Sequence, residues 1–173
     1  MLPKKFNDCL ERLRNGDKQA IKEIYIENYE KMTFAALSKV KNVAAAEDIA
    51  SEFIMYIFEN AAQIGYIEKP DSWLYKGVVN RAIDYVRKCG RTVSLLSIEE
   101  TAAAAAEHDN DLICLLSDAF QNLTEREKEI FILHYIYGFK YQEIADTLYI
   151  PVGTIKRCVS EMKDKLAYLE EQF

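Results

Sequence analysis

Apolar residues recur at three- and four-residue spacing along almost the whole chain, and the alternation that a β-strand needs persists nowhere. In the first half this spacing predicts helices over about 7–14, 17–40 and 44–61. The third of these carries an apolar stripe expected to face a core, formed by Ile49, Phe53, Tyr56 and Ile57. The pattern therefore predicts an all-α protein.

A loop over 63–72 separates these helices from a longer one. Asp71 or Ser72 can cap the start of that helix, because a short polar side chain accepts a bond from the first turn. We expect the helix to run to about Lys88 and to end at Cys89-Gly90, since glycine is favoured just past a helix end.

The last third of the chain predicts a helix-turn-helix. Thr124 and Glu127 have the spacing of a capping box, which begins a helix that ends at Gly138. Pro151 suits the first turn of the last helix. The last two helices each have one apolar face, formed by Tyr141, Ile144, Ala145 and Leu148 and then by Ile155, Val159, Met162, Leu166 and Leu169.

The last helix also has a polar face that suits the major groove of DNA. That groove is about 12 Å wide and admits a helix whose N-terminal side chains reach base edges. Lys156 and Arg157 can bind guanine or phosphate, and Thr154 lies where a helix N-terminus favours phosphate. The DNA-binding residues predicted here are Thr154, Lys156, Arg157, Ser160 and Lys163. The same spacing also fits a helical hairpin that only packs, with a solvated basic face.

Charge divides the chain into three parts. The net charge of −6 argues against a protein that coats nucleic acid by bulk electrostatics. The acid is concentrated in 91–120, a segment without an amphipathic stripe. We therefore expect two small helical domains, 1–91 and 112–173, joined by a flexible acidic linker over 92–111.

The residue types give no sign of catalysis. The four cysteines are scattered without a CxxC pair or a nearby histidine pair, so neither a metal site nor a disulfide framework is predicted. No glycine-rich phosphate loop or nucleophile–base pair appears, so we expect no catalytic residue and no cofactor. No apolar run approaches the roughly 20 residues that cross a bilayer, which predicts a cytoplasmic protein without membrane insertion.

Three sequence motifs resemble those of bacterial sigma factors of the sigma-70 superfamily. REKEIFILHYIYGFKYQEIADTLYIPVGTIK is similar to their promoter-binding C-terminal domain, with the EIA triplet, the turn and the GT before a basic residue. AEDIASEFIMYIFE resembles the polymerase-binding helix, and WLYKGVVNRAIDYVRK the helix beside the downstream promoter element. The resemblance covers roughly 10–90 and 112–168, in the family's order. The closest group is the compact extracytoplasmic-function (ECF) type.

This resemblance implies a factor that binds core RNA polymerase, recognises promoter DNA and promotes strand opening for transcription initiation, without catalysis of its own. The implied partners are the clamp of the largest polymerase subunit, the flap of the second-largest subunit, promoter DNA as duplex and as melted strand, and an anti-sigma factor. Asp48, Ile49, Glu52 and Phe53 match the positions that dock on the clamp. Carboxylates beside an apolar ridge can pair with arginines of a partner, although Phe53 fits a core position equally well.

A basic stripe lies on the helix after the loop. The segment 69–91 holds six basic residues against two acidic ones, and such a stripe can follow phosphates. The resemblance puts base-specific reading in the preceding loop, where Tyr66 can stack on an unpaired base. Trp73 and Tyr75 are weaker candidates, and Trp73 fits the core better. The DNA-binding residues predicted for this half are Tyr66, Lys76, Asn80, Arg81 and Arg87.

Two residues depart from the family pattern. Cys158 and Glu161 stand where family members usually carry further basic groups on the last helix. An acid that faces DNA repels phosphate but can accept a bond from cytosine.

Two other classes of protein compete with this interpretation. A helix-turn-helix regulator that binds DNA without loading polymerase needs only the C-terminal part, and leaves AEDIASEF and WLYKGVVNRAIDYVRK without a role. An enzyme with a DNA-binding tail needs chemistry that 1–110 does not offer.

Overall fold

A computed structural model describes residues 1–93, 120 and 122–170 of the chain, and the side chains of 90–93 and 167–170 lie outside that description. The chain divides into two compact units, Met1–Ala104 and Ala105–Phe173. The described residues form helices and no strand, which confirms the predicted all-α class. The predicted linker beyond Val93 and the expected start of the second domain at Leu112 fall outside the described residues.

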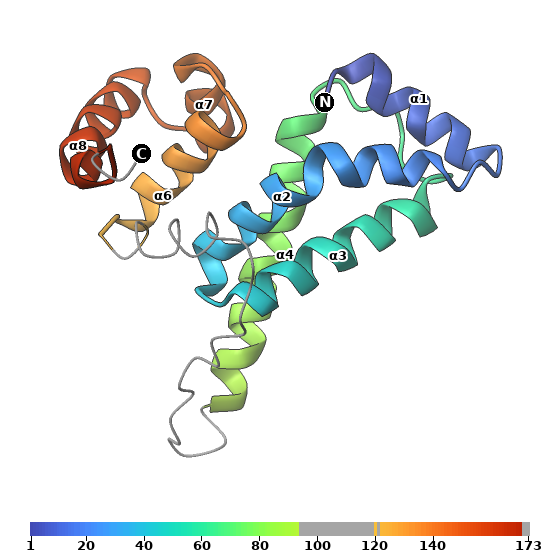
Figure 1. The fold of residues 1–173 in the computed structure, drawn as a ribbon, viewed down its shortest axis with the longest axis horizontal. Coiled ribbons are helices and arrows are strands. Elements are labelled where there is room, and N and C mark those ends of the chain that lie inside the picture. The colour runs from blue at the N-terminus through green and yellow to red at the C-terminus, as the bar shows by residue number, and fades with distance from the viewer. Residues whose placement is uncertain (94–119, 121, 171–173) are drawn as a thin grey trace. The chain divides into compact units, whose positions relative to one another are not determined.

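The first unit is a bundle built around its second helix. It contains α1 (Pro3–Arg14), α2 (Ala20–Val40), α3 (Val43–Asn60) and α4 (Pro70–Val93), and α2 contacts each of the other three (Figure 1). The C-terminal half of α2, from Met32 to Ser38, is buried at every position. A helix that is buried on every side carries few charges there, and the run MTFAALS has none.

A tight connection turns the chain back from α2 into α3. Lys41 adopts the left-handed conformation (φ 55°) and its N–H donates to Leu37 O, which closes α2. The side chain of Asn42 then accepts from the N–H of Ala45 at 2.8 Å and caps α3. A connection this short makes the two helices antiparallel neighbours.

Phe53 holds α3 against α4. Its side chain is 1% exposed, and its ring lies 5.5 Å from the ring of Trp73. Trp73 in turn lies 6.0 Å from Phe6, which brings α1 into the same cluster. Opposite Phe53 stands Gly77, where a Cβ atom would approach the Phe53 ring to 2.2 Å. The two helices can therefore pack this closely only because residue 77 has no side chain.

The limits of α4 differ from the prediction at both ends. The helix begins at Pro70 rather than after a cap at Asp71 or Ser72, and proline is favoured at a first helical position because it has no N–H to leave unpaired. It also continues through Gly90 to Val93, past the end predicted at Cys89-Gly90. Glycine inside a helix costs only about 1 kcal/mol, so it does not by itself end one.

The core stripe predicted for α3 is right at three of its four positions. Ile49, Phe53 and Ile57 are buried, whereas Tyr56 is 40% exposed. Tyr56 lies beside the core, where the guanidinium of Arg81 packs over its ring at 4.5 Å.

The second unit confirms the predicted helix-turn-helix. It contains α6 (Glu125–Phe131), the π-helical η1 (Ile132–Ile136), α7 (Tyr141–Leu148) and α8 (Val152–Glu170). The capping box is present: the N–H of Glu127 donates to Thr124 Oγ1, and the Glu127 carboxylate accepts from the N–H of Thr124 at 2.8 Å. Fully buried side chains from every helix form the core: Ile130, Leu133, Ile144, Ile155 and Met162. Leu166, predicted on the same apolar face of α8, is half-buried, and the side chain of Leu169 lies outside the description.

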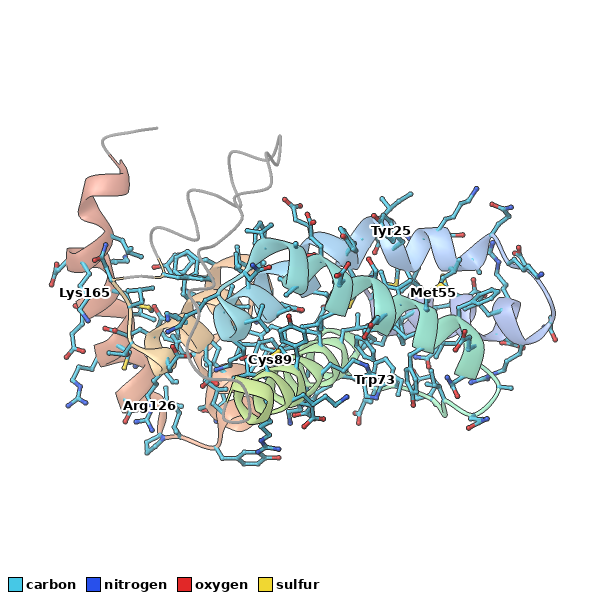
Figure 2. All side chains as sticks on the ribbon, turned by 90° about the horizontal axis from the view of Figure 1, so that it is seen from below. Tyr25, Met55, Trp73, Cys89, Arg126 and Lys165 are labelled. Carbon is cyan, nitrogen blue, oxygen red and sulfur yellow. The ribbon has the colours of Figure 1, made fainter. Side chains whose placement is uncertain are left out.

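A buried carboxylate ties α8 to the start of α6. Glu127 is 3% exposed, and Lys165 on α8, labelled in Figure 2, donates to its two oxygens at 2.7 and 2.9 Å. Burial alone would raise the pKa of Glu127, but the bonds from Lys165 and Thr124 outweigh it, so this pKa is lowered.

Among the described helices, none is both long and apolar enough to span a lipid bilayer.

The close contact at Gly77 predicts a stability effect. We expect Gly77→Ala to lower the free energy of unfolding by about 1–3 kcal/mol, because the new methyl group overpacks against the Phe53 ring. The fluorescence of Trp73, the only tryptophan of the chain, reports the unfolding of this unit. Gly65→Ala is the control, since open space surrounds that position. Equal urea midpoints for the two variants would contradict the contact.

The second stability prediction concerns Glu127. Since its folded pKa lies below the unfolded value of about 4.3, its stabilisation is present above that pH and is lost as pH falls through the folded pKa. We expect Glu127→Gln to cost about 1–3 kcal/mol at pH 7, and the difference from the parent chain to shrink below about pH 4. The measurement is helix unfolding by circular dichroism, with Trp73 fluorescence unchanged as the internal control. A difference independent of pH would contradict this assignment.

Candidate nucleic-acid and polymerase interfaces

The N-terminal half of α8 exposes the polar face that the sequence predicts. Lys156, Arg157, Ser160 and Lys163 are exposed and Thr154 is half-buried, while the opposite side of the helix forms the core. Positions 156, 160 and 163 make one line along the helix at four- and three-residue spacing. Thr154 lies in the first turn of the helix, where the free N–H groups and the dipole favour an anion.

The turn before α8 fixes the direction of that helix. Tyr149 adopts the left-handed conformation (φ 57°) and is 85% exposed. The N–H of Ile150 donates to Ala145 O at 3.2 Å, and Pro151 O accepts from the N–H of Thr154 at 2.9 Å. Pro151 directly precedes the helix instead of occupying its first turn. These bonds connect the end of α7 to the first turn of α8 without a flexible segment.

The two residues that depart from the family pattern differ in exposure: Cys158 is buried and Glu161 is exposed. Cys158 is 7% exposed and lies on the core side of α8, so it is not part of the polar face. Glu161 is exposed, as expected, and its carboxylate lies 3.6 Å from Nε of Arg157. The acid thus moderates the charge of a predicted DNA contact, a pairing that the four-residue spacing could have indicated.

On α3 the predicted polymerase-binding residues separate into two groups. Asp48 and Glu52 are exposed one turn apart. Ile49 and Phe53 are 4% and 1% exposed, so their side chains are not available to a partner and drop out of the predicted docking surface. The exposed apolar neighbour is Met55, which is 52% exposed and lies one turn beyond Glu52. The three- and four-residue spacing of the apolar residues on this helix could not show which of them face the core.

The basic stripe on α4 is only partly open. Lys76, Asn80 and Arg87 are exposed, as predicted. Arg81 is half-buried, with its guanidinium 4.3 Å from the centre of the Phe53 ring, and this burial lowers its pKa. Arg87 also lies 3.5 Å from Asp84 on the same helix, and an exposed pair of this kind contributes little stability.

In the loop before α4, one aromatic residue is available for stacking. Tyr66 is 73% exposed. Tyr75 is 3% exposed and is therefore excluded as a stacking partner, and Trp73 is half-buried in the Phe53 cluster. Sequence reasoning missed the role of Asn7, whose side-chain amide bonds to the backbone of Ile67 in this loop. No local pattern marks that contact, because 60 positions separate the two residues.

In the part of the chain that the structure describes, no group of three or more histidine, cysteine or carboxylate side chains comes together as a metal site would require.

Comparison with known proteins identifies the family. Residues 115–166, which include the helix-turn-helix, match the family "Sigma-70, region 4". The chain is 32% identical over 123 residues to the RNA polymerase sigma factor SigV of Bacillus subtilis, which covers 70% of this chain and 73% of SigV. It is 26% identical over 172 residues to the ECF RNA polymerase sigma factor SigW of the same organism, which covers 91% and 92%.

A solved structure agrees with these matches at the level of the fold. The sigma factor RpoE of Bartonella quintana, solved in complex with the anti-sigma factor NepR, superposes with a TM-score of 0.63 at 23% identity, over 88% of this chain and 98% of RpoE. The family match and these relatives show that the chain belongs to the sigma-70 superfamily of RNA polymerase sigma factors and is of the extracytoplasmic-function type.

Proposed function

We propose that the chain recruits core RNA polymerase to promoters through three surfaces, one for the enzyme and two for DNA. The observation that carries this proposal is α8: its apolar side is the core of a helix-turn-helix in the region-4 match, and its other side exposes Lys156, Arg157, Ser160 and Lys163. A helix held this way can enter the major groove with these side chains toward bases and phosphates. In this assignment Thr154 binds a phosphate at the helix N-terminus.

The enzyme surface is the acidic face of α3. Asp48 and Glu52 would pair with basic groups on the clamp of the largest subunit, and Met55 would supply the apolar contact in place of Ile49 and Phe53. Exposed charge pairs chiefly steer association and fix orientation, whereas apolar burial adds affinity. The same proposal gives the second unit a contact with the flap of the second-largest subunit.

The third surface binds the promoter where it opens. Lys76, Asn80 and Arg87 would follow the phosphates along α4, and Tyr66 would stack on an unpaired base. Arg81 differs from the other residues of this surface, because its guanidinium packs over the aromatic rings of α3. Its main role in this proposal is to hold α4 in place. The domain limits 1–91, 92–111 and 112–173 remain part of this proposal.

In the proposed reaction sequence the polymerase forms the phosphodiester bonds, and this chain acts as an initiation factor without catalysis, in the cytoplasm. RpoE is solved with an anti-sigma factor, and we extend that class of partner to this chain as a proposal. A regulator that binds DNA without polymerase is not favoured, because similarity to SigW extends over 172 residues and includes the first unit.

The DNA surface of α8 can be tested by charge removal. We expect Lys156→Ala with Arg157→Ala to abolish promoter-directed run-off transcription and to leave the affinity for core polymerase unchanged. Two lost phosphate contacts should also reduce the slope of log K against log salt by about 2. The control is Lys18→Ala with Lys22→Ala, which removes the same charge from exposed positions at the start of α2. Transcription that survives in the α8 variant would overturn this assignment.

The polymerase surface can be tested by charge reversal. We expect Asp48→Lys with Glu52→Lys to weaken binding to core polymerase about tenfold or more, because like charges would then meet across the interface. Binding of the isolated chain to promoter duplex should change little. Asp8→Lys with Glu30→Lys is the matched control, since both carboxylates are exposed on other helices of the same unit. Equal core affinities for the two variants, measured by fluorescence anisotropy, would remove α3 from the interface.

A further inference from the structure

Helix geometry fixes the direction in which α8 faces away from its core. Successive residues turn by about 100° around the axis, since one turn takes 3.6 residues. The core side is marked by the buried Ile155, Val159 and Met162. The opposite direction passes between Ser160 and Glu161, both of which are exposed. A helix that enters the major groove with its core side outward therefore turns these two positions toward the bases.

Charge divides the exposed face of α8 along its length. Lys156 and Lys163 lie near one edge, about 80–100° from the direction opposite the core, where their side chains can meet the phosphates of one groove wall. Glu161 lies on the other side of that direction. A carboxylate repels phosphate, so the favourable partner of this acid in the groove is a base.

Arg157 pairs with the Glu161 carboxylate one turn further along α8. Its Nε lies 3.6 Å from Oε1 of Glu161, and the two side chains are 73% and 52% exposed. An exposed pair of this kind contributes little stability, so its effect is on orientation and local charge. A guanidinium has five N–H donors, and a pair through Nε leaves its terminal nitrogens for the proposed DNA contact. Arg157 thereby offsets the charge of an acid that approaches DNA.

The four bases differ in what they offer to a carboxylate in the major groove. Guanine presents only acceptors there, and thymine presents an acceptor and a methyl group. Adenine has an amino donor next to the acceptor N7, whereas cytosine presents an amino donor alone. Because an ionised carboxylate can only accept, it favours cytosine and is repelled most by guanine.

We infer that Glu161 is a specificity-determining residue, which accepts from the N4 amino group of one cytosine in the promoter duplex. The inference rests on the proposed function and assigns one base to the DNA surface of α8. A lysine or arginine at the same position would favour guanine instead. The acid therefore changes which base is recognised and does more than weaken the attraction to phosphate.

The test uses holoenzyme assembled from the full chain and core polymerase. A promoter is first obtained by run-off transcription on genomic fragments, and each base pair of its duplex part is then replaced in turn by the other three. The affinity for each duplex is measured by fluorescence anisotropy at one salt concentration. We expect the parent to prefer cytosine over guanine about tenfold at one position, and Glu161→Ala to lower this ratio to about one without changing the ratios elsewhere.

Glu161→Gln is the conservative variant. Glutamine removes the charge and keeps an oxygen that can accept from cytosine, so part of the preference over guanine should remain. Glutamine also binds adenine through N6 and N7, and we expect adenine to be tolerated better at this position. A role for Glu161 in folding alone predicts no change of base preference in either variant.

Asp164→Ala is the matched control, because Asp164 is an exposed acid on the same helix. It removes the same charge and should leave every base preference unchanged. If Glu161 merely repels DNA, Glu161→Ala will bind all duplexes more tightly by the same factor. That result overturns the inference, as does a parent without the cytosine preference or an equal loss of it in Asp164→Ala.

Failure of this inference and failure of the proposed function give different results. A parent holoenzyme that starts no transcript contradicts the proposed function itself. A parent that starts transcripts, loses them with Lys156→Ala and Arg157→Ala, and keeps its base preferences with Glu161→Ala contradicts this inference alone.

Discussion

The arrangement of the first unit depends on the contact between Phe53 and Gly77. Because a glycine faces the ring, α3 and α4 approach so closely that a single methyl group would meet the ring at 2.2 Å. Trp73 and Phe6 extend this cluster to α1, and Arg81 covers it from α4. The cluster thereby sets the position of the acidic face of α3, the basic stripe of α4 and the loop held by α1. Phe53, a residue first considered for binding polymerase, instead helps to position these parts of the first unit.

In the second unit, an ion pair with a buried carboxylate holds the helices together. Its apolar core is small, and the capping carboxylate of α6, Glu127, is also the partner of Lys165 on α8. Removing Lys165 would cost more than the ion pair contributes, because the buried carboxylate of Glu127 would be left without this partner. One carboxylate therefore fixes both where α6 begins and how α8 lies across it. Insertion of α8 into the major groove, as proposed, would need α8 to be held in a fixed orientation.

Local sequence patterns predicted much of this structure, because helix capping and the burial of one helix face depend on residues within a few positions of each other. The capping box at Thr124 and the buried stripes through Ile144 on α7 and Ile155 on α8 each follow from spacing within a single helix, and all are present. The sequence could not separate Met55 from Phe53, since both lie on an apolar helix and only the position of α4 decides which is covered. The pair of Asn7 with Ile67 was unpredictable for a related reason: it depends on the folded path of the chain between them.

For a chain of net charge −6, the proposed DNA binding depends on where the exposed cations lie and not on the total charge. Arg12, Lys128 and Lys165 are bonded to carboxylates of their own unit, and Arg87 and Arg157 on the proposed DNA surfaces also lie beside carboxylates. The contribution of an exposed cation to the proposed DNA binding therefore depends on its position. Each proposed DNA surface has only a few such cations. Surfaces this small bind weakly alone, but two that are linked act at a high effective concentration on one promoter. Under the proposed function, selectivity would then require both units to be engaged at once.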